Sequence, residues 1–149
     1  MKLNSIVMLL FVALLTACKG SAYDLSSYGL NPDTGENASP LMAKALQQIA
    51  AESNSDTVRI FLPKGRYDFY PTGASEREYF ISNHDQDNPK QVGLAFENMK
   101  NVVFDGQGSA LVFHGRMLPV SLVGSDNCTL KNFSIDFANP HISQVKVLE

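Results

Sequence analysis

Two short segments that each begin with asparagine place the strongest constraint on the fold of this chain. The block Asn101–Gly106 aligns with the block Asn127–Asn132 at an offset of 26 residues. Each block is followed by a second short apolar segment, at 110–113 and at 133–137. Short strands that repeat at such a spacing indicate the coils of a parallel solenoid. A twisted antiparallel sandwich also has short strands and frequent turns, and it is the alternative.

The pattern predicts an all-β chain that holds the first few coils of a parallel β-helix behind an N-terminal capping helix. Ser39-Pro40 opens the helix, since Ser suits an N-cap and Pro suits the first helical position. Apolar residues then recur at helical spacing: Leu41, Met42, Ala45, Leu46 and Ile49. Such a helix would cover the strand edges of the first coil. Alternation over 58–62 and 67–69 predicts strands directly after it.

The expected core consists of alternating residues of the two repeats. The candidates for inward positions are Val102, Phe104, Leu111, Phe113, Cys128, Leu130, Phe133 and Ile135, of which an alternating subset would stack coil on coil. At the corner of the first repeat, Gly106 and Gly108 are expected to supply positive φ angles. We expect the asparagine that starts each block to bond its own backbone at a bend.

The N-terminal segment predicts export. Lys2 precedes an apolar core at 6–15, which is shorter than the ~20 residues that a membrane span needs and suits a secretory signal. The end of this segment, Leu-Thr-Ala-Cys at 15–18, resembles the bacterial lipoprotein box. That resemblance implies cleavage before Cys18, acyl chains on Cys18, and anchoring in the bacterial cell envelope, either in the periplasm or at the outer membrane. An ordinary secretory signal with an incidental cysteine is the alternative.

These features predict three parts. Residues 1–17 form the signal, 18–23 a tether, and 24–149 the cap and first coils of a domain truncated at its C-terminus, because 145–149 stops inside an alternating strand pattern. Lys and Arg number 12 against 15 Asp and Glu, and no basic stripe marks a nucleic-acid partner. Cys128 alone remains beside the lipidated cysteine, so no internal disulfide is expected. No Cys/His spacing suits zinc, and no cofactor is expected.

Two family resemblances support the β-helix. Residues 58–67, with a strand, a Pro-Lys-Gly turn and a Tyr, resemble the entry segment of pectate-lyase-like right-handed β-helix proteins. A closer resemblance joins residues 79–86, 100–109, 113–119, and 132–136 with 139–141, to the N-terminal region of glycoside hydrolase family 110. These bacterial alpha-1,3-galactosidases are several-fold longer than this chain.

The second resemblance implies an inverting exo-hydrolase that removes terminal α-1,3-linked galactose from host glycans such as blood group B antigens. Inversion needs two carboxyl groups ~6.5–9.5 Å apart. No such pair is assigned here, so we expect the catalytic carboxylates beyond Glu149, and the isolated chain to be inactive and prone to aggregation. A polysaccharide lyase on the same scaffold, or a non-enzymatic glycan-binding or adhesive β-helix, are the alternatives.

Three residues are candidates for substrate binding. His84 and Asp85 lie in a polar loop and could bond sugar hydroxyls, or else belong to a solvated loop held by its own turns. Arg116 follows a strand and could bind a ligand or a carboxylate of a neighbouring coil. Asp105 precedes a glycine, which favours a turn role. Asp136 projects from a strand, as a solvated or turn-bonding carboxylate or as the lining of a groove.

Overall fold

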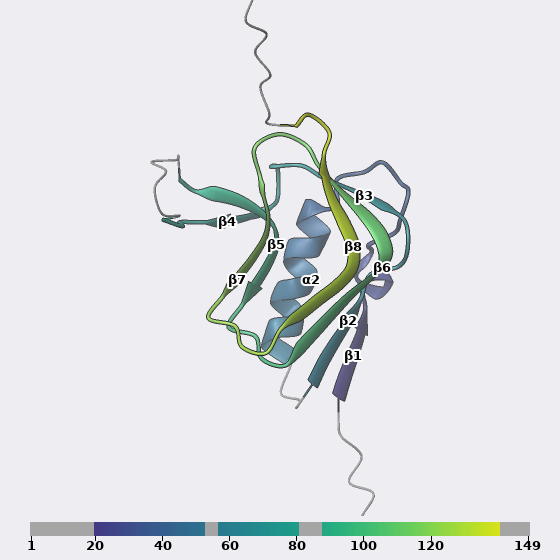
Figure 1. The fold of residues 1–149 in the computed structure, drawn as a ribbon, viewed down its shortest axis with the longest axis vertical. Helices are drawn as coiled ribbons and strands as arrows, with labels where there is room; N and C mark the ends of the chain where they lie inside the picture. The colour runs from purple at the N-terminus through teal and green to yellow at the C-terminus, as the bar shows by residue number, and fades with distance from the viewer. Residues whose placement is uncertain (1–19, 53–56, 81–87, 141–149) are drawn as a thin grey trace, which may run out of the picture.

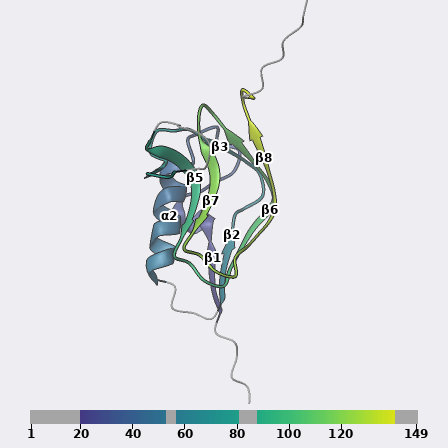
Figure 2. The same cartoon turned by 60° about the vertical axis from the view of Figure 1, so that its left-hand side comes forward.

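The computed structural model describes residues 20–52, 57–80 and 88–140 (Figures 1 and 2). Parallel strands and one α-helix make up most of this part of the chain, which confirms the predicted predominance of β structure. The elements are β1 (Gly20–Asp24), the 3-10 helix η2 (Leu25–Tyr28), α2 (Ser39–Glu52), β2 (Thr57–Phe61), β3 (Arg66–Phe69), β4 (Ser75–Arg77), β5 (Lys90–Glu97), β6 (Val102–Phe113), β7 (Leu118–Val123) and β8 (Thr129–Phe137).

The strands form two sheets. In the five-stranded sheet β1, β2 and β6 follow one another, β3 pairs with β6 beside β2, and β8 pairs with the other side of β6. Every pairing in this sheet is parallel. In the three-stranded sheet β5 pairs with β7 in parallel and with the short β4 in antiparallel fashion. The predominance of parallel pairs argues against the antiparallel sandwich.

The two asparagine-led blocks lie side by side and in register, as predicted. Val103 pairs with Thr129, which reproduces the offset read from the sequence. The Asn127 Nδ2 donates a hydrogen bond of 2.7 Å to the Asn101 Oδ1 across the 26-residue separation. Val92 of β5 pairs with Leu118 of β7 at the same offset. The asparagines therefore bond each other across the stack, in addition to adopting positive φ angles of 54° and 51° at Asn101 and Asn127.

Gly106 has a different role from the one predicted. Positive φ angles occur at Gln107 (51°) and Gly108 (86°), and Gly106 has none. A Cβ on Gly106 would lie 2.6 Å from the Phe133 Cβ and 2.8 Å from the Asn132 carbonyl oxygen. The register between β6 and β8 shifts between Asp105 and Ser109. Gly106 is thus required because β8 approaches its backbone closely at this irregularity.

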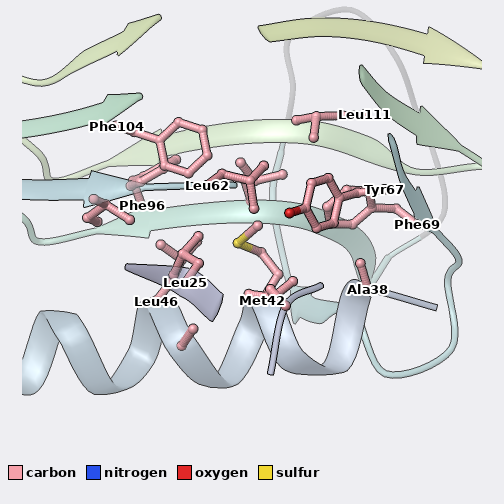
Figure 3. Packing of buried hydrophobic residues seen from close by; sticks show 14 of the residues in the cluster. Leu25, Ala38, Met42, Leu46, Leu62, Tyr67, Phe69, Phe96, Phe104 and Leu111 are labelled. Carbon is pink, nitrogen blue, oxygen red and sulfur yellow. The ribbon is translucent and has the colours of Figure 1, made fainter. Parts of the chain in front are cut away.

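Helix α2 packs one face against the core, as Figure 3 shows for Met42 and Leu46. Its buried apolar residues are Met42, Ala45, Leu46 and Ile49. Leu41, which the sequence also placed in this stripe, is 38% exposed. It lies at the edge of the stripe and lines a surface groove beside Tyr28 of η2.

The start of α2 differs in detail from the prediction that Ser39 caps it. The Asn37 Oδ1 accepts a hydrogen bond from the Ser39 backbone N–H (3.0 Å). The Ser39 hydroxyl instead donates to the Tyr70 carbonyl (2.7 Å) and accepts from the Tyr70 N–H (3.0 Å). Ser39 is fully buried and joins the helix to the residue after β3.

The predicted core residues of the first repeat, Val102, Phe104, Leu111 and Phe113, are all fully buried. Those of the second repeat are less covered: Cys128, Leu130 and Phe133 are partly buried against the core, and Ile135 is 44% exposed. The reason is positional, because β8 pairs only with β6 and no described strand lies on its other side.

The N-terminal boundary also differs from the prediction. Strand β1 begins at Gly20, inside the range 18–23 that was expected to be a tether, and Gly20 pairs with Thr57 of β2. Parallel ladder bonds to β2 order these residues. Within the described residues, no helix is long and apolar enough to cross a membrane.

Candidate functional site

The candidate residues named from the sequence divide into those that the structure describes and those that it does not. Cys18, His84 and Asp85 lie outside the described residues. Arg116 is exposed in the connection between β6 and β7. Its role in ligand binding stays a prediction.

Asp105 and Asp136 both make local bonds. The Asp105 Oδ1 accepts from the Gln107 N–H and from the Asn132 Nδ2, each at 2.9 Å. The bond from Asn132, more than any other contact, lowers the pKa of Asp105. The Asp136 Oδ1 accepts from the Phe137 N–H at 2.8 Å. Asp105 therefore stabilises the turn and its neighbour β8, and Asp136 is an exposed carboxylate that bonds the backbone.

Sequence reasoning missed a cluster around Asp68, which we call the β3 cluster and define as Arg66, Asp68, Tyr70 and His114. The Arg66 Nη2 lies 2.7 Å from the Asp68 Oδ1, and its Nε lies 3.1 Å from Oδ2. The His114 Nε2 lies 2.7 Å from the same Oδ1. The ring of His114 stacks on Tyr70, with centroids 4.1 Å apart and planes at 8°. A carboxylate with only 7% exposure is thus held by an Arg fork and an imidazole.

The electrostatics of the β3 cluster favour an ionised Asp68. Its hydrogen bonds from Arg66 are the largest influence and lower its pKa, burial opposes them, and His114 adds to the lowering. The same contact raises the pKa of Arg66. An Asp in this state accepts hydrogen bonds and cannot give up a proton at neutral pH.

A second cluster, the β5 cluster, consists of Arg77, Tyr79, Glu97 and Ser121. Arg77 binds Glu97 through two bonds, Nε to Oε1 at 2.6 Å and Nη2 to Oε2 at 2.7 Å. The Tyr79 hydroxyl lies 2.9 Å from the Glu97 Oε1 and 3.3 Å from the Ser121 hydroxyl. The cluster therefore joins β4 and the residues after it to β5 and β7.

Glu97 is also held ionised. The bonds from Arg77 lower the pKa of Glu97 more than burial raises it. Burial is the main cause that raises the pKa of Tyr79. The general acid of a glycosidase is a carboxyl group whose pKa is raised. Asp68 and Glu97, each bound by an arginine fork, have the opposite property and are not suited to that role.

No simple sequence signal identifies either cluster. Asp68 and His114 are 46 positions apart, and Arg77 and Glu97 are 20 apart, so neither pair falls within a motif. The strand alternation around Tyr67 could have placed Arg66 and Asp68 together on the outward face. It could not have named His114 as their partner.

The structure also contains a surface groove of about 340 Å³ between η2 and α2. Its lining consists of Ser27, Tyr28, Leu41, Lys44, Ala45 and Gln48. Among the described residues no group of His, Cys, Asp and Glu side chains could hold a metal ion.

Comparison with known proteins identifies relatives over nearly the whole chain. A protein of Parabacteroides distasonis named alpha-1,3-galactosidase B is 61% identical over 145 residues, which are 96% of this chain and 24% of that protein. One of Phocaeicola vulgatus with the same name is 55% identical and matches 100% of this chain and 26% of its own length. An alpha-1,3-galactosidase A of Shewanella woodyi is 44% identical over 78% of this chain. No protein-family model matches the chain.

Over nearly its whole length the chain is similar to proteins named alpha-1,3-galactosidase. This confirms the resemblance that the polar segments of the sequence indicated. The chain spans about a quarter of the length of the curated relatives that it matches. Those relatives are glycoside hydrolases by name, and the described part of this chain contains two carboxylate clusters that are both arranged to stay ionised.

Proposed function

We propose that this chain is the N-terminal part of an exo-acting, inverting alpha-1,3-galactosidase that removes terminal α-1,3-linked galactose from host glycans of the blood group B type. The observation that carries this proposal is 55–61% identity over nearly the whole chain to proteins named alpha-1,3-galactosidase B. The matched regions cover 96% and 100% of the chain and therefore include the polar segments that carried the resemblance.

The scaffold that we propose is a right-handed parallel β-helix with α2 as its N-terminal cap. Two sheets support it, because β5 pairs with β7 in parallel at an offset of 26 residues, and β6 pairs with β8 in parallel at an offset of 26 before the register shift and 24 after it. Helix α2 packs against β5 (Figures 1 and 2), whose one edge pairs with β7. On the other edge β4 pairs only with residues 90–92, so residues 93–97 have no strand partner there among the described residues. A helix in that position covers an edge that would otherwise be open to pairing.

In this proposal the two catalytic carboxyl groups come from the three quarters of the relatives that this chain does not span. The support is chemical. Inverting hydrolysis needs one carboxyl group with a raised pKa and one that activates water. Asp68 and Glu97, whose side chains are both partly or fully enclosed, have lowered pKa values because arginine binds them.

The decisive experiment is a chimera. This chain replaces the matching residues of the Parabacteroides distasonis relative, and hydrolysis of α-D-galactosyl-(1→3)-D-galactose is followed by NMR. We expect the chimera to release galactose that appears first as the β-anomer, and the chain alone to release none. The intact relative is the positive control.

Two results would contradict the proposal. A folded chimera without hydrolysis would show that this chain does not serve as the N-terminal part of such an enzyme. Release of an unsaturated sugar from a polysaccharide that contains uronic acid, detected by its ultraviolet absorbance, would favour the lyase, and glycan binding without cleavage would favour the adhesive module.

We further propose that acyl chains on Cys18 anchor the protein in the bacterial envelope, since the Leu-Thr-Ala-Cys sequence at 15–18 provides the expected modification site. Several acyl chains bind membranes firmly, because each buried CH₂ adds ~0.8 kcal/mol. The test is metabolic labelling with a palmitate analogue in a bacterial host. Wild-type protein should incorporate label and sediment with membranes, and the Cys18→Ser variant should do neither. Equal membrane association of the two would refute the anchor.

A further inference from the structure

The β3 cluster lies on the outward face of the five-stranded sheet. Tyr67 and Phe69 are buried in the core, so the alternating residues Arg66, Asp68 and Tyr70 lie on the other face. The register continues this row across the sheet, where Asp68 pairs with Val112 of β6 and Val112 pairs with Asp136 of β8. Figure 1 shows β3, β6 and β8 side by side. Asp136 is therefore two strands away from Asp68 on the same face.

Burial of Asp68 is unusual for this position. Core packing does not require it, because the residue points away from the core. Its side chain is nonetheless only 8% exposed, while those of Arg66 and His114 are 54% and 24% exposed. Desolvating a carboxylate costs free energy unless charged partners compensate. The buried Asp68 carboxylate bonds two partly exposed side chains, Arg66 and His114, and thereby fixes their orientation.

The two side chains present unused polar atoms to solvent. Asp68 engages the Nε2 atom of His114, so a neutral ring keeps Nδ1 as an acceptor on its opposite side. Asp68 engages Nε and Nη2 of Arg66 and leaves the Nη1 donors for another group. Stacking on Tyr70, itself 36% exposed, fixes the plane of the His114 ring. Asp136 adds an exposed carboxylate acceptor.

We propose that the β3 cluster, together with Asp136, binds the hydroxyl edge of a neutral hexopyranose residue of a glycan. A ring of adjacent hydroxyl groups needs donors and acceptors held in fixed positions beside an apolar surface, and this face offers an Arg donor, an imidazole acceptor, a carboxylate and an aromatic pair. A neutral ligand fits this face better than an anionic one, because the two carboxylates, Asp68 and Asp136, carry more charge than the one guanidinium, Arg66. Asp136 is close enough to raise the pKa of Arg66, after the larger effect of Asp68.

The test monitors the NMR signal of the His114 ring nitrogen atoms. The full chain, labelled with 15N-histidine and purified in detergent, contains three histidines, and His114→Gln assigns the signal. Methyl α-D-galactopyranoside, methyl α-D-glucopyranoside and sodium sulfate are titrated separately. We expect a saturable shift of the His114 signal with a methyl pyranoside and none with sulfate. Arg66→Ala should weaken the binding about tenfold, and Lys100→Ala, an exposed cation elsewhere, should not.

This inference would be overturned if the His114 signal of the folded chain did not shift with either methyl pyranoside, or if it shifted with sulfate alone. Lower melting temperatures of the Arg66 and His114 variants without any sugar response would assign the cluster a structural role only and would overturn it as well. The chimera carries the same residues and is followed in the same way, so an insoluble chain does not end the test. Hydrolysis is not read in this experiment. A responding His114 in an inactive chimera would therefore keep the inference and refute the proposed function.

Discussion

The two ends of the strand stack differ in how their apolar residues are covered. At the covered end, η2 contributes Leu25 and α2 contributes Met42 and Ile49, each with 0% exposure. At the outer end, β7 and β8 leave Leu122 50% and Ile135 44% exposed. The residues that pair with these two on the preceding strands, Phe96 and Leu111, are both 0% exposed.

These register pairs isolate the effect of one more strand. Each pair, Phe96 with Leu122 and Leu111 with Ile135, occupies equivalent positions on adjacent strands. Among the described residues, only the strand of the inner member has a neighbour on both sides. In a stacked fold the apolar side chains of one strand are thus buried mainly by the adjacent strands. Most of this burial is gained when the next strand is added. Exposed strand edges and apolar side chains at the outer end favour association with other chains.

The largest expected effect comes from a core aromatic residue shared between strands. Phe104 is fully buried and makes edge-to-face contacts with Phe96 (5.7 Å) and Phe133 (5.6 Å). Phe104→Ala should lower the free energy of unfolding by about 3–5 kcal/mol, because it removes apolar contacts and leaves a cavity. Ile135→Ala at the outer end should cost about 1 kcal/mol or less. Urea unfolding of both variants measures the difference, and equal losses would contradict the comparison.

A smaller effect is expected at the closest approach between β6 and β8. Gly106→Ala places a methyl group against Phe133 and the Asn132 carbonyl, so β8 must shift at a cost of about 1–3 kcal/mol. Gly35→Ala is the matched control, since no atom lies within 4 Å of its added Cβ although its φ is +71°. Thermal unfolding should show a larger loss at position 106. A larger loss at position 35 would mean that backbone conformation dominates over the approach of β8.

The β3 cluster should make stability depend on pH. The pKa of Asp68 is lowered in the folded state, so its contribution is fully present above the unfolded pKa of about 3.9 and is lost as pH falls through the folded value. Asp68→Asn should cost about 1–2 kcal/mol at neutral pH and flatten the acid side of the stability profile. Urea unfolding from neutral pH down to acid measures both. Parallel profiles for variant and wild type would contradict the assignment.

The smallest effect on stability is expected for polar substitution at the outer end. Leu122→Lys combined with Ile135→Lys should change the free energy of unfolding by about 0.5 kcal/mol or less, yet increase the monomeric fraction. Leu41→Lys is the control, because Leu41 is 38% exposed at the covered end. Size-exclusion chromatography with light scattering measures the monomeric fraction of each variant. An equal gain from Leu41→Lys would mean that association does not depend on the outer end.

Local pattern and repeat spacing were sufficient to predict the helix, the strands directly after it, the strands of the two repeats and the stacking of the asparagine-led blocks. The reason is that stacking in register repeats the same residue type at the same spacing, as Asn101 and Asn127 show. The start of β1 was missed because a strand of five residues depends on its pairing with β2 more than on its own alternation. The role of Gly106 was missed because close approach depends on a partner strand, whereas a corner is suggested by the residue itself.

The β3 and β5 clusters could not be predicted in the same way. Each is assembled from residues on different strands, and the strand pairing, rather than any spacing, brings Asp68 to His114 and Glu97 to Arg77. The sequence drew attention to His84, Asp85 and Arg116 because polar residues stood out within short segments. Conversely, Asp105 was read correctly as a turn residue, since its bonds to Gln107 and Asn132 lie at a local corner.

Hydrogen exchange tests the proposed β-helix by showing whether further strands cover its outer end when this chain replaces the matching residues of a longer relative. Amides of β7 and β8 are compared between the chain alone and the chimera with the Parabacteroides distasonis relative. We expect these amides to exchange at least tenfold more slowly in the chimera, which corresponds to about 1.4 kcal/mol. The amides of α2 should change much less. Unchanged exchange in β7 and β8 in a folded chimera would contradict the proposed β-helix.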